Sequence, residues 1–229
     1  MIIISNALQA VQVRILRAAL QCGRAPDSIA VIAVSKQVSV DALRCAFEAG
    51  QRAFGESYVQ EALPKIAALQ DLPITWHFIG PLQSNKTKLV AENFAWVHSV
   101  ERAKIAQRLS DQRPAHLPPL NVCLQVNVSQ EASKAGVAPE EVHALAQVVA
   151  TLPKIKLRGL MAIPEATPNR VQQHAQFRLL SSLWDQLNAQ GFFLDTLSMG
   201  MSDDLEAAIA EGATVVRVGS AIFGAREKT

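Results

Sequence analysis

The sequence has few of the features that mark secreted, membrane or metal-binding proteins. Its three cysteines, Cys22, Cys45 and Cys123, are too scattered for a zinc knuckle or a C-x-x-C pair, so we expect buried, reduced thiols. No apolar run approaches the roughly 20 residues of a membrane helix. The N-terminal stretch MIIISN has no basic leader. These absences predict a cytoplasmic protein without a membrane partner.

Motifs of several enzyme classes are missing as well. There is no G-x-G-x-x-G after the first predicted strand, no Walker loop, no G-x-S-x-G elbow and no pair of histidines with zinc-ligand spacing. The formal net charge of +2 is too small to indicate a nucleic-acid partner. With 49% apolar residues, the composition is globular, and we expect a single domain over residues 1–229 that binds no metal.

Short β-rich runs alternate with helical patterns along the chain. Eight such runs, the first at residues 28–36 and the last at 214–219, are each separated from the next by a helical stretch. Strands that alternate with helices pair in parallel, and eight units in this length predict a single (β/α)8 TIM barrel. An extra helix at about residues 6–21 precedes the first strand. The main alternative is an open doubly wound sheet.

The ends of the predicted strands attract attention because a TIM barrel carries its site at the C-terminal ends of its strands. Lys36 closes the first strand, in the stretch VIAVSK. An amine at the barrel mouth would be partly desolvated, and burial makes amines better nucleophiles toward carbonyls. Lys36 is therefore a candidate for a Schiff base. The alternative is a lysine that reaches solvent or pairs with a carboxylate.

Two later strand ends offer donors for a phosphate group. Ser202 is a candidate N-cap of the helix expected after the seventh strand, and the N–H groups of a helix start can hold phosphate. Gly219 and Ser220 offer a second set of donors after the eighth strand, where barrels often bind phosphate. Arg217, inside that strand, is a permanent donor that either faces a ligand or pairs with a carboxylate.

Two histidines lie on predicted strands. His77 occurs in TWHFIG and His98 in WVHSV. A histidine in such a position is more often a hydrogen-bonded core residue than a catalyst, and we interpret both residues in that way.

Six stretches of the sequence, in this order, resemble the pyridoxal phosphate homeostasis proteins, a family related to the N-terminal barrel of alanine racemase. They are AVSK, FGESYVQEA, WHFIGPLQSNK, LRGLMAIP, LSMGMSDDLEAAI and RVGSAIFG, and the match runs from about residue 9 to residue 226. The resemblance implies a barrel that holds pyridoxal 5'-phosphate (PLP) as a Schiff base on Lys36.

The resemblance also assigns roles around the cofactor. It implies that Ser202 and backbone N–H groups near Gly219 and Ser220 hold the phosphate, and that Arg217 faces the pyridine nitrogen. Arginine donates a hydrogen bond there rather than a proton, so the ring would be a poor electron sink and carbanion chemistry would be weakly supported. The implied cofactor-binding residues are Lys36, Ser57, Met199, Gly200, Ser202, Arg217, Gly219 and Ser220.

Three positions qualify the resemblance. Ser57 stands where the family usually has asparagine, which leaves a shorter side chain with fewer donors near the cofactor. Gln37 stands where threonine is common. Lys134 matches a family lysine on a loop, where it is either a secondary PLP site or a solvated charge.

The resemblance implies a non-catalytic PLP carrier that acts in vitamin B6 homeostasis, with effects on amino-acid balance. Its partners would be PLP and the PLP-dependent apo-enzymes that receive it, and we expect a monomer. One alternative is a small amino-acid racemase, which needs a second base. The only tyrosine is Tyr58, and the chain ends soon after the eighth strand, without room for the second domain of alanine racemase. Another is a Schiff-base aldolase that uses Lys36 without a cofactor.

Overall fold

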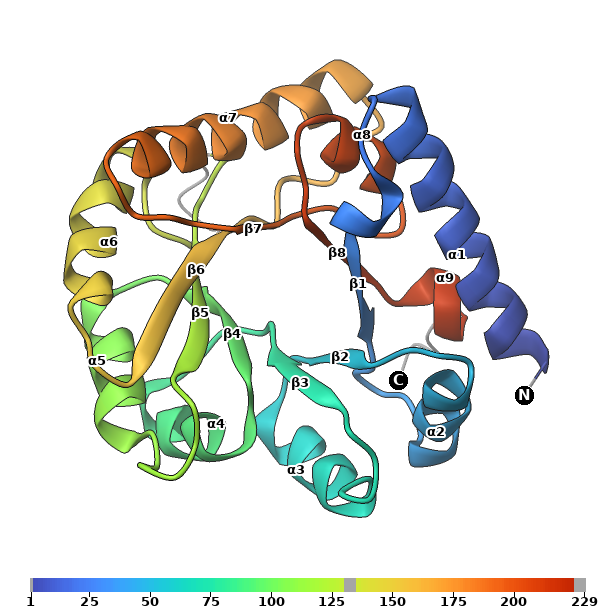
Figure 1. The fold of residues 1–229 in the computed structure, drawn as a ribbon, viewed down its shortest axis with the longest axis horizontal. Helices are drawn as coiled ribbons and strands as arrows, with labels where there is room; N and C mark the ends of the chain where they lie inside the picture. Colours follow the sequence, from blue (N-terminus) through green and yellow to red (C-terminus); the bar gives the residue numbers. More distant parts are fainter. Residues whose placement is uncertain (1, 130–134, 225–229) are drawn as a thin grey trace.

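Parallel strands close into a barrel at the centre of the molecule, and helices surround it (Figure 1). This computed structural model describes residues 2–129 and 135–224. Each of the eight strands pairs in parallel with the next, and β8 pairs with β1, so the ring has no open edge. The predicted (β/α)8 barrel is confirmed, and the open doubly wound sheet is excluded.

The elements alternate as expected, and most strands are shorter than the predicted runs. The strands are β1 (Ala30–Val34), β2 (Ala53–Glu56), β3 (Thr75–Phe78), β4 (Trp96–Val100), β5 (Leu120–Gln125), β6 (Ile155–Met161), β7 (Thr196–Ser198) and β8 (Val215–Val218). The helices are α1 (Ile2–Gln21), α2 (Val40–Glu48), α3 (Val59–Ala68), α4 (Thr87–Asn93), α5 (Ala103–Gln112), α6 (Val142–Ala150), α7 (Arg170–Ala189), α8 (Leu205–Ala210) and α9 (Ser220–Phe223).

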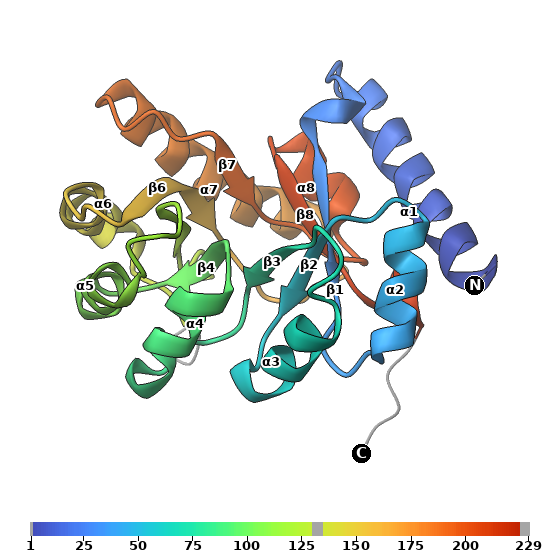
Figure 2. The same ribbon diagram turned by 60° about the horizontal axis from the view of Figure 1, so that its bottom comes forward.

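The first helix is longer than the pattern predicts. It was expected at about residues 6–21 and begins at Ile2, because nothing in the stretch before Asn6 breaks a helix and Ile4 already packs against the core. Its buried face contains Leu8, Val11 and Ile15, at helical spacing. In Figures 1 and 2, α1 lies outside the barrel, against α8, α9 and α2.

Cysteine burial agrees only in part with the expectation. Cys123 on β5 is fully buried, Cys45 is half-buried, and Cys22 at the end of α1 is exposed, so the prediction of buried thiols is wrong for Cys22. No described helix is long and apolar enough to cross a membrane. Within residues 2–129 and 135–224, no group of three or more His, Cys, Asp and Glu side chains is arranged to hold a metal ion.

Candidate functional site

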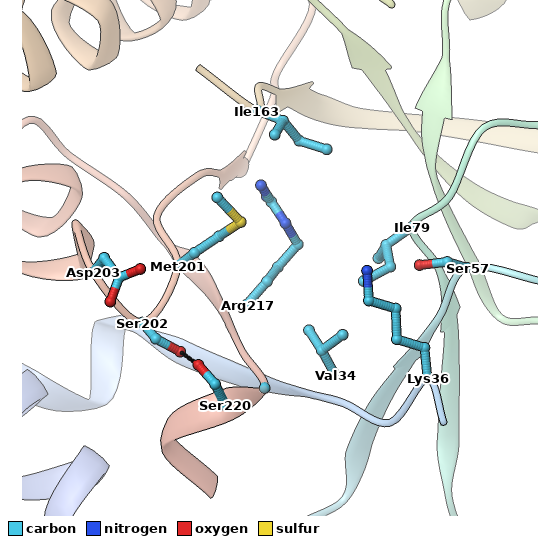
Figure 3. Close-up of a pocket in the computed structure, with 11 residues that line it drawn as sticks. Val34, Lys36, Ser57, Ile79, Ile163, Met201, Ser202, Asp203, Arg217 and Ser220 are labelled. Atoms are coloured by element: carbon cyan, nitrogen blue, oxygen red, sulfur yellow. Dashed lines mark hydrogen bonds between the residues drawn. The ribbon is translucent and has the colours of Figure 1, made fainter. Parts of the chain in front are cut away.

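A pocket of about 220 Å³ lies at the C-terminal ends of the strands, where the barrel geometry predicts a site. Figure 3 shows Lys36 on one side, Ser202 and Ser220 on the other, and Arg217 between them. Six of the eight predicted cofactor-binding residues line this pocket. The lining residues are Val34, Lys36, Ser57, Ile79, Ile163, Met201, Ser202, Asp203, Arg217, Gly219 and Ser220.

Lys36 reaches the pocket from a turn that follows β1. The strand ends at Val34. The next residue, Ser35, still bonds to the neighbouring strand, because its N–H donates to the carbonyl of Gly55 (2.9 Å). Lys36 is half-buried and its amine projects into the pocket (Figure 3). The predicted position at the barrel mouth is therefore confirmed.

Ser57 lies beside Lys36, at the end of β2. In Figure 3 its hydroxyl points toward the lysine side chain. A glycine makes this arrangement possible: a Cβ atom on Gly80 would lie 2.2 Å from the backbone oxygen of Ser57, so only glycine allows the β2 and β3 ends to approach so closely. The backbone after β3 thus helps to fix the Ser57 turn.

Ser202 and Ser220 form a pair of hydroxyl groups on the opposite side. The Ser220 hydroxyl donates to the Ser202 hydroxyl across 3.1 Å, which joins the loop after β7 to the loop after β8 (Figure 3). The predicted capping role of Ser202 is wrong, because α8 begins only at Leu205 and Asp204 occupies the cap position. The hydroxyl pair and the backbone at Gly219 remain as donors for an anion.

The N-terminal helix holds the Ser202 loop in place. Arg14 of α1 donates to the Ser202 carbonyl (2.9 Å) and pairs with both carboxylate oxygens of Glu206 (2.8 and 2.9 Å). Inside the loop, the N–H of Met201 donates to the Asp204 carboxylate (2.6 Å). The extra helix therefore supports a loop that lines the pocket, and it also packs against the core.

Two of the predicted residues do not line the pocket. The Met199 side chain is fully buried in the core, and Gly200 lies behind the wall with φ of 93°. The cause is that pairing continues past the end of β7: the N–H of Met199 donates to Val215, and the Gly200 carbonyl accepts from Arg217. Met201 is the first residue of this loop to line the pocket.

Arg217 is held in place by the hydrogen bonds that its guanidinium group donates. Its guanidinium donates to the Ser198 carbonyl (2.6 Å), the Ser198 hydroxyl (2.8 Å) and the Ala162 carbonyl (2.8 Å). Only 3% of the residue is exposed, and burial lowers its pKa to about 10, so it stays charged at neutral pH. Among the described residues, no carboxylate forms an ion pair with it, and the expected alternative of a salt bridge is not what the structure shows.

A chain of hydrogen bonds continues from Arg217 through the barrel interior. Nδ1 of His98 lies 2.9 Å from the Ser198 hydroxyl, and Nε2 of His98 lies 3.0 Å from Nδ1 of His77. Arginine can only donate, so the Ser198 hydroxyl oxygen accepts from Arg217, while the donor in each of the two histidine contacts depends on the tautomer of the rings. Burial lowers the pKa of His77 to about 3 and the pKa of His98 well below its usual range, so both are neutral. Their interpretation as hydrogen-bonded core residues is confirmed.

Sequence reasoning missed five lining residues. They have in common a place just before or after an already suspected strand end, and apolar side chains dominate: Val34, Ile79, Ile163, Met201 and Asp203. Extending each predicted strand end by up to three residues would have found them. Lys134 falls outside the described residues.

Comparisons with known proteins agree with this geometry. Residues 8–227 match the family model described as alanine racemase, N-terminal domain. A pyridoxal phosphate homeostasis protein of Pseudomonas aeruginosa is 62% identical over 98% of this chain and 96% of its own length, and one of Escherichia coli is 52% identical over 98% and 97%. The chain belongs to the pyridoxal phosphate homeostasis protein family. The resemblance of the sequence to that family is thereby confirmed.

Solved structures separate the family from its more distant relatives. PipY of Synechococcus elongatus, a protein solved with PLP bound, is 37% identical to this chain, with a TM-score of 0.84 over 96% of this chain and all of its own. Alanine racemase from Corynebacterium glutamicum is only 14% identical, with a TM-score of 0.70, and the match covers 62% of the racemase. The racemase therefore shares the fold with this member of the homeostasis family, and the likeness extends no further than that.

Proposed function

We propose that this chain binds PLP in the described pocket, covalently on Lys36, and acts as a non-catalytic carrier in PLP homeostasis. The observation that supports this most is the convergence of an amine, a buried guanidinium and a pair of hydroxyls on one hollow. The names of the relatives and the PLP-bound structure of PipY point to the same ligand.

The residues fit the three polar parts of PLP. When bound, the cofactor would supply an aldehyde that can form a Schiff base with a lysine amine, with loss of water. Lys36 presents such an amine to the pocket. Ser202 and Ser220 present hydroxyl donors to a phosphate, and the backbone at Gly219 can approach it closely. Arg217, between the two sides, offers a permanent donor to the ring nitrogen.

A carrier fits the site better than a racemase does. A racemase needs acid–base groups on both faces of its substrate. Tyr58, the only tyrosine of the sequence, is 57% exposed and is not among the residues that line the pocket. Arg217 donates hydrogen bonds without giving up its proton at neutral pH, which does not favour carbanion chemistry. The proposal therefore assigns retention and release of PLP to this chain, and catalysis to the enzymes that receive it.

The first experiment is an absorption spectrum of the purified protein with PLP, before and after borohydride, followed by peptide mass mapping. The wild-type protein should show a visible band that borohydride removes, with the cofactor mass on Lys36. Lys36→Ala should lose the band and keep its melting temperature, while Lys88→Ala, on an exposed face of α4, should behave as wild type. Absence of any band would favour the cofactor-free aldolase, and racemisation of an added amino acid would favour the racemase.

Three further parts of the proposal concern the setting of the protein. We propose a monomer in the cytoplasm that passes PLP to apo-enzymes. Sedimentation equilibrium would detect any dimer, and fractionation would locate the protein. Transfer to an apo-enzyme can be followed as recovery of its activity, with PLP released into buffer as the comparison that separates direct delivery from simple dissociation.

A further inference from the structure

A cluster of three charged side chains lies next to the turn that carries Lys36. Lys65 of α3 donates to Glu56 at the end of β2 (2.9 Å) and to Glu61, four residues earlier on the same helix (2.6 Å). The Lys65 side chain is 8% exposed and that of Glu56 is fully buried. Removing charges from water is costly, so such a cluster calls for a reason beyond attraction between opposite charges.

The cluster forms hydrogen bonds with the residues on both sides of Lys36. Before the lysine, the Ser35 carbonyl accepts from Lys65 (2.7 Å), and the Ser35 hydroxyl donates to Glu56 (2.6 Å). After it, the N–H of Gln37 donates to Glu61. The two neighbours are therefore tied to the barrel wall, while the Lys36 side chain between them lines the pocket.

The residue after Lys36 has an unfavourable backbone conformation. Gln37 has a φ of 61°, in the left-handed region that residues other than glycine rarely adopt. Its side chain is exposed and cannot hold the backbone through packing. Residues stay in such a conformation only where their surroundings impose it, and they are common at functional sites. The bond from Gln37 to Glu61 supplies that restraint.

The cluster is poorly arranged for stability alone. One oxygen of Glu56, Oε2, is buried without a hydrogen-bond partner in the described part of the chain. Burial raises the pKa of this carboxyl, which means that its charged form is disfavoured where it lies. Lys65 uses all three of its N–H donors, on Ser35, Glu56 and Glu61, so its amine is committed to these contacts.

We infer that Glu61 and Lys65 are positioning residues for Lys36: Lys65 with Glu56 fixes the backbone before it, and Glu61 keeps Gln37 in the left-handed conformation after it. Together they direct the amine into the pocket before any ligand arrives. This rests on the proposed function, in that Lys36 is the residue that captures PLP. It gives the stretch GESYVQEALPK a role that the pocket alone does not explain.

The test combines one weakening and one rescuing substitution. Glu61→Ala should raise the dissociation constant for PLP, measured by absorbance titration, by roughly tenfold, because the bond that holds the strained Gln37 backbone is lost together with the bond from Lys65. Glu61→Gln keeps an acceptor and should lose little. Gln37→Gly in the Glu61→Ala protein should restore most of the affinity, since glycine adopts the left-handed region without strain. Glu92→Ala, from the exposed Lys88–Glu92 pair of the same spacing, is the matched control.

A second readout needs no cofactor. Hydrogen exchange of the amides at residues 35–38 should speed up at least severalfold in Glu61→Ala relative to wild type and Glu92→Ala. A general weakening of α3 would not be rescued by Gln37→Gly, so a double variant as weak as Glu61→Ala overturns the inference, as does unchanged exchange. If wild-type protein takes up no PLP on Lys36, the proposed function is wrong, and hydrogen exchange still decides whether the cluster holds the turn.

Discussion

The two basic residues that border the pocket, Arg217 and Lys36, are held in opposite ways. Arg217 is held through its own guanidinium, by carbonyl groups and a hydroxyl, with the neutral His98 beyond them. The Lys36 turn is held through the backbone of its neighbours, by Lys65 and two carboxylates. On one side of the pocket, the neutral side, uncharged polar groups therefore hold a charged side chain. On the other, the ionic side, charged side chains hold the backbone next to Lys36.

The difference fits the roles proposed for the two side chains. A donor that faces a ligand nitrogen works best when its own geometry is fixed, and Arg217 can spend three hydrogen bonds on that. A lysine that reacts with an aldehyde needs a mobile amine at a fixed place. Hydrogen bonds to the backbone of Ser35 and Gln37 fix the place of the turn that carries this lysine.

The largest expected effect comes from removing the charge at the centre of the ionic side. Lys65→Met keeps the apolar stem and leaves Glu56 buried without its cation, which should lower the free energy of unfolding by about 3–5 kcal/mol. Urea denaturation measures this. Lys88→Met, which breaks an exposed pair, should cost less than about 1 kcal/mol. Equal effects in the two variants would mean that the buried cluster does not support this side of the barrel.

The neutral histidines on the Arg217 side should make the free energy of unfolding depend on pH. His77 has a pKa of about 3 in the folded protein and an ordinary value of 6.5, so below about pH 6.5 the unfolded chain takes up a proton that the folded chain does not. Stability from this group is complete above pH 6.5 and is lost as the pH falls. His77→Asn should therefore reduce the slope of unfolding free energy against pH, between about pH 5.5 and 4, by about 1.4 kcal/mol per unit.

His116→Asn is the control for that slope, because His116 is exposed. A wild-type slope in the His77→Asn protein would show that His77 is protonated in the folded state.

The stability of the ionic side depends on pH in the opposite direction. The raised pKa of Glu56 contributes stability that is present at low pH and is lost as the pH rises above about 4.5. The two sides of one pocket thus respond to pH in opposite directions.

The sequence predicted the barrel because its signals are periodic and local. Apolar runs such as the one in β1 and helical stretches such as α7 carry their pattern along the chain. The ends of helices and strands were predicted less accurately. The first strand was expected to run to Lys36 and stops at Val34, since the chain turns away to place the lysine. The start of α1 was missed because the pattern before Asn6 has too few residues to show a period.

The site divides in the same way. Residues at strand ends were found, since their position follows from the barrel. The sequence did not show whether Met199 or Met201 lines the pocket, because this depends on how far the pairing of β7 with β8 continues beyond the strand. The Lys65 cluster was missed because it joins the ends of two strands to a helix face, and nothing local in GESYVQEALPK indicates which partner its lysine will have.

Both noted departures from the family pattern, Ser57 and Gln37, fall on the Lys36 side of the pocket. We therefore expect position 57 to tolerate an asparagine. Ser57→Asn restores an amide with two donors next to Lys36 and should change the dissociation constant for PLP by less than about fivefold, as expected for one hydrogen bond. Absorbance titration measures the constant, with Ser129→Asn, outside the pocket lining, as the control. A change of a hundredfold would mean that Ser57 contacts the cofactor directly, and that the expected tolerance of this position is wrong.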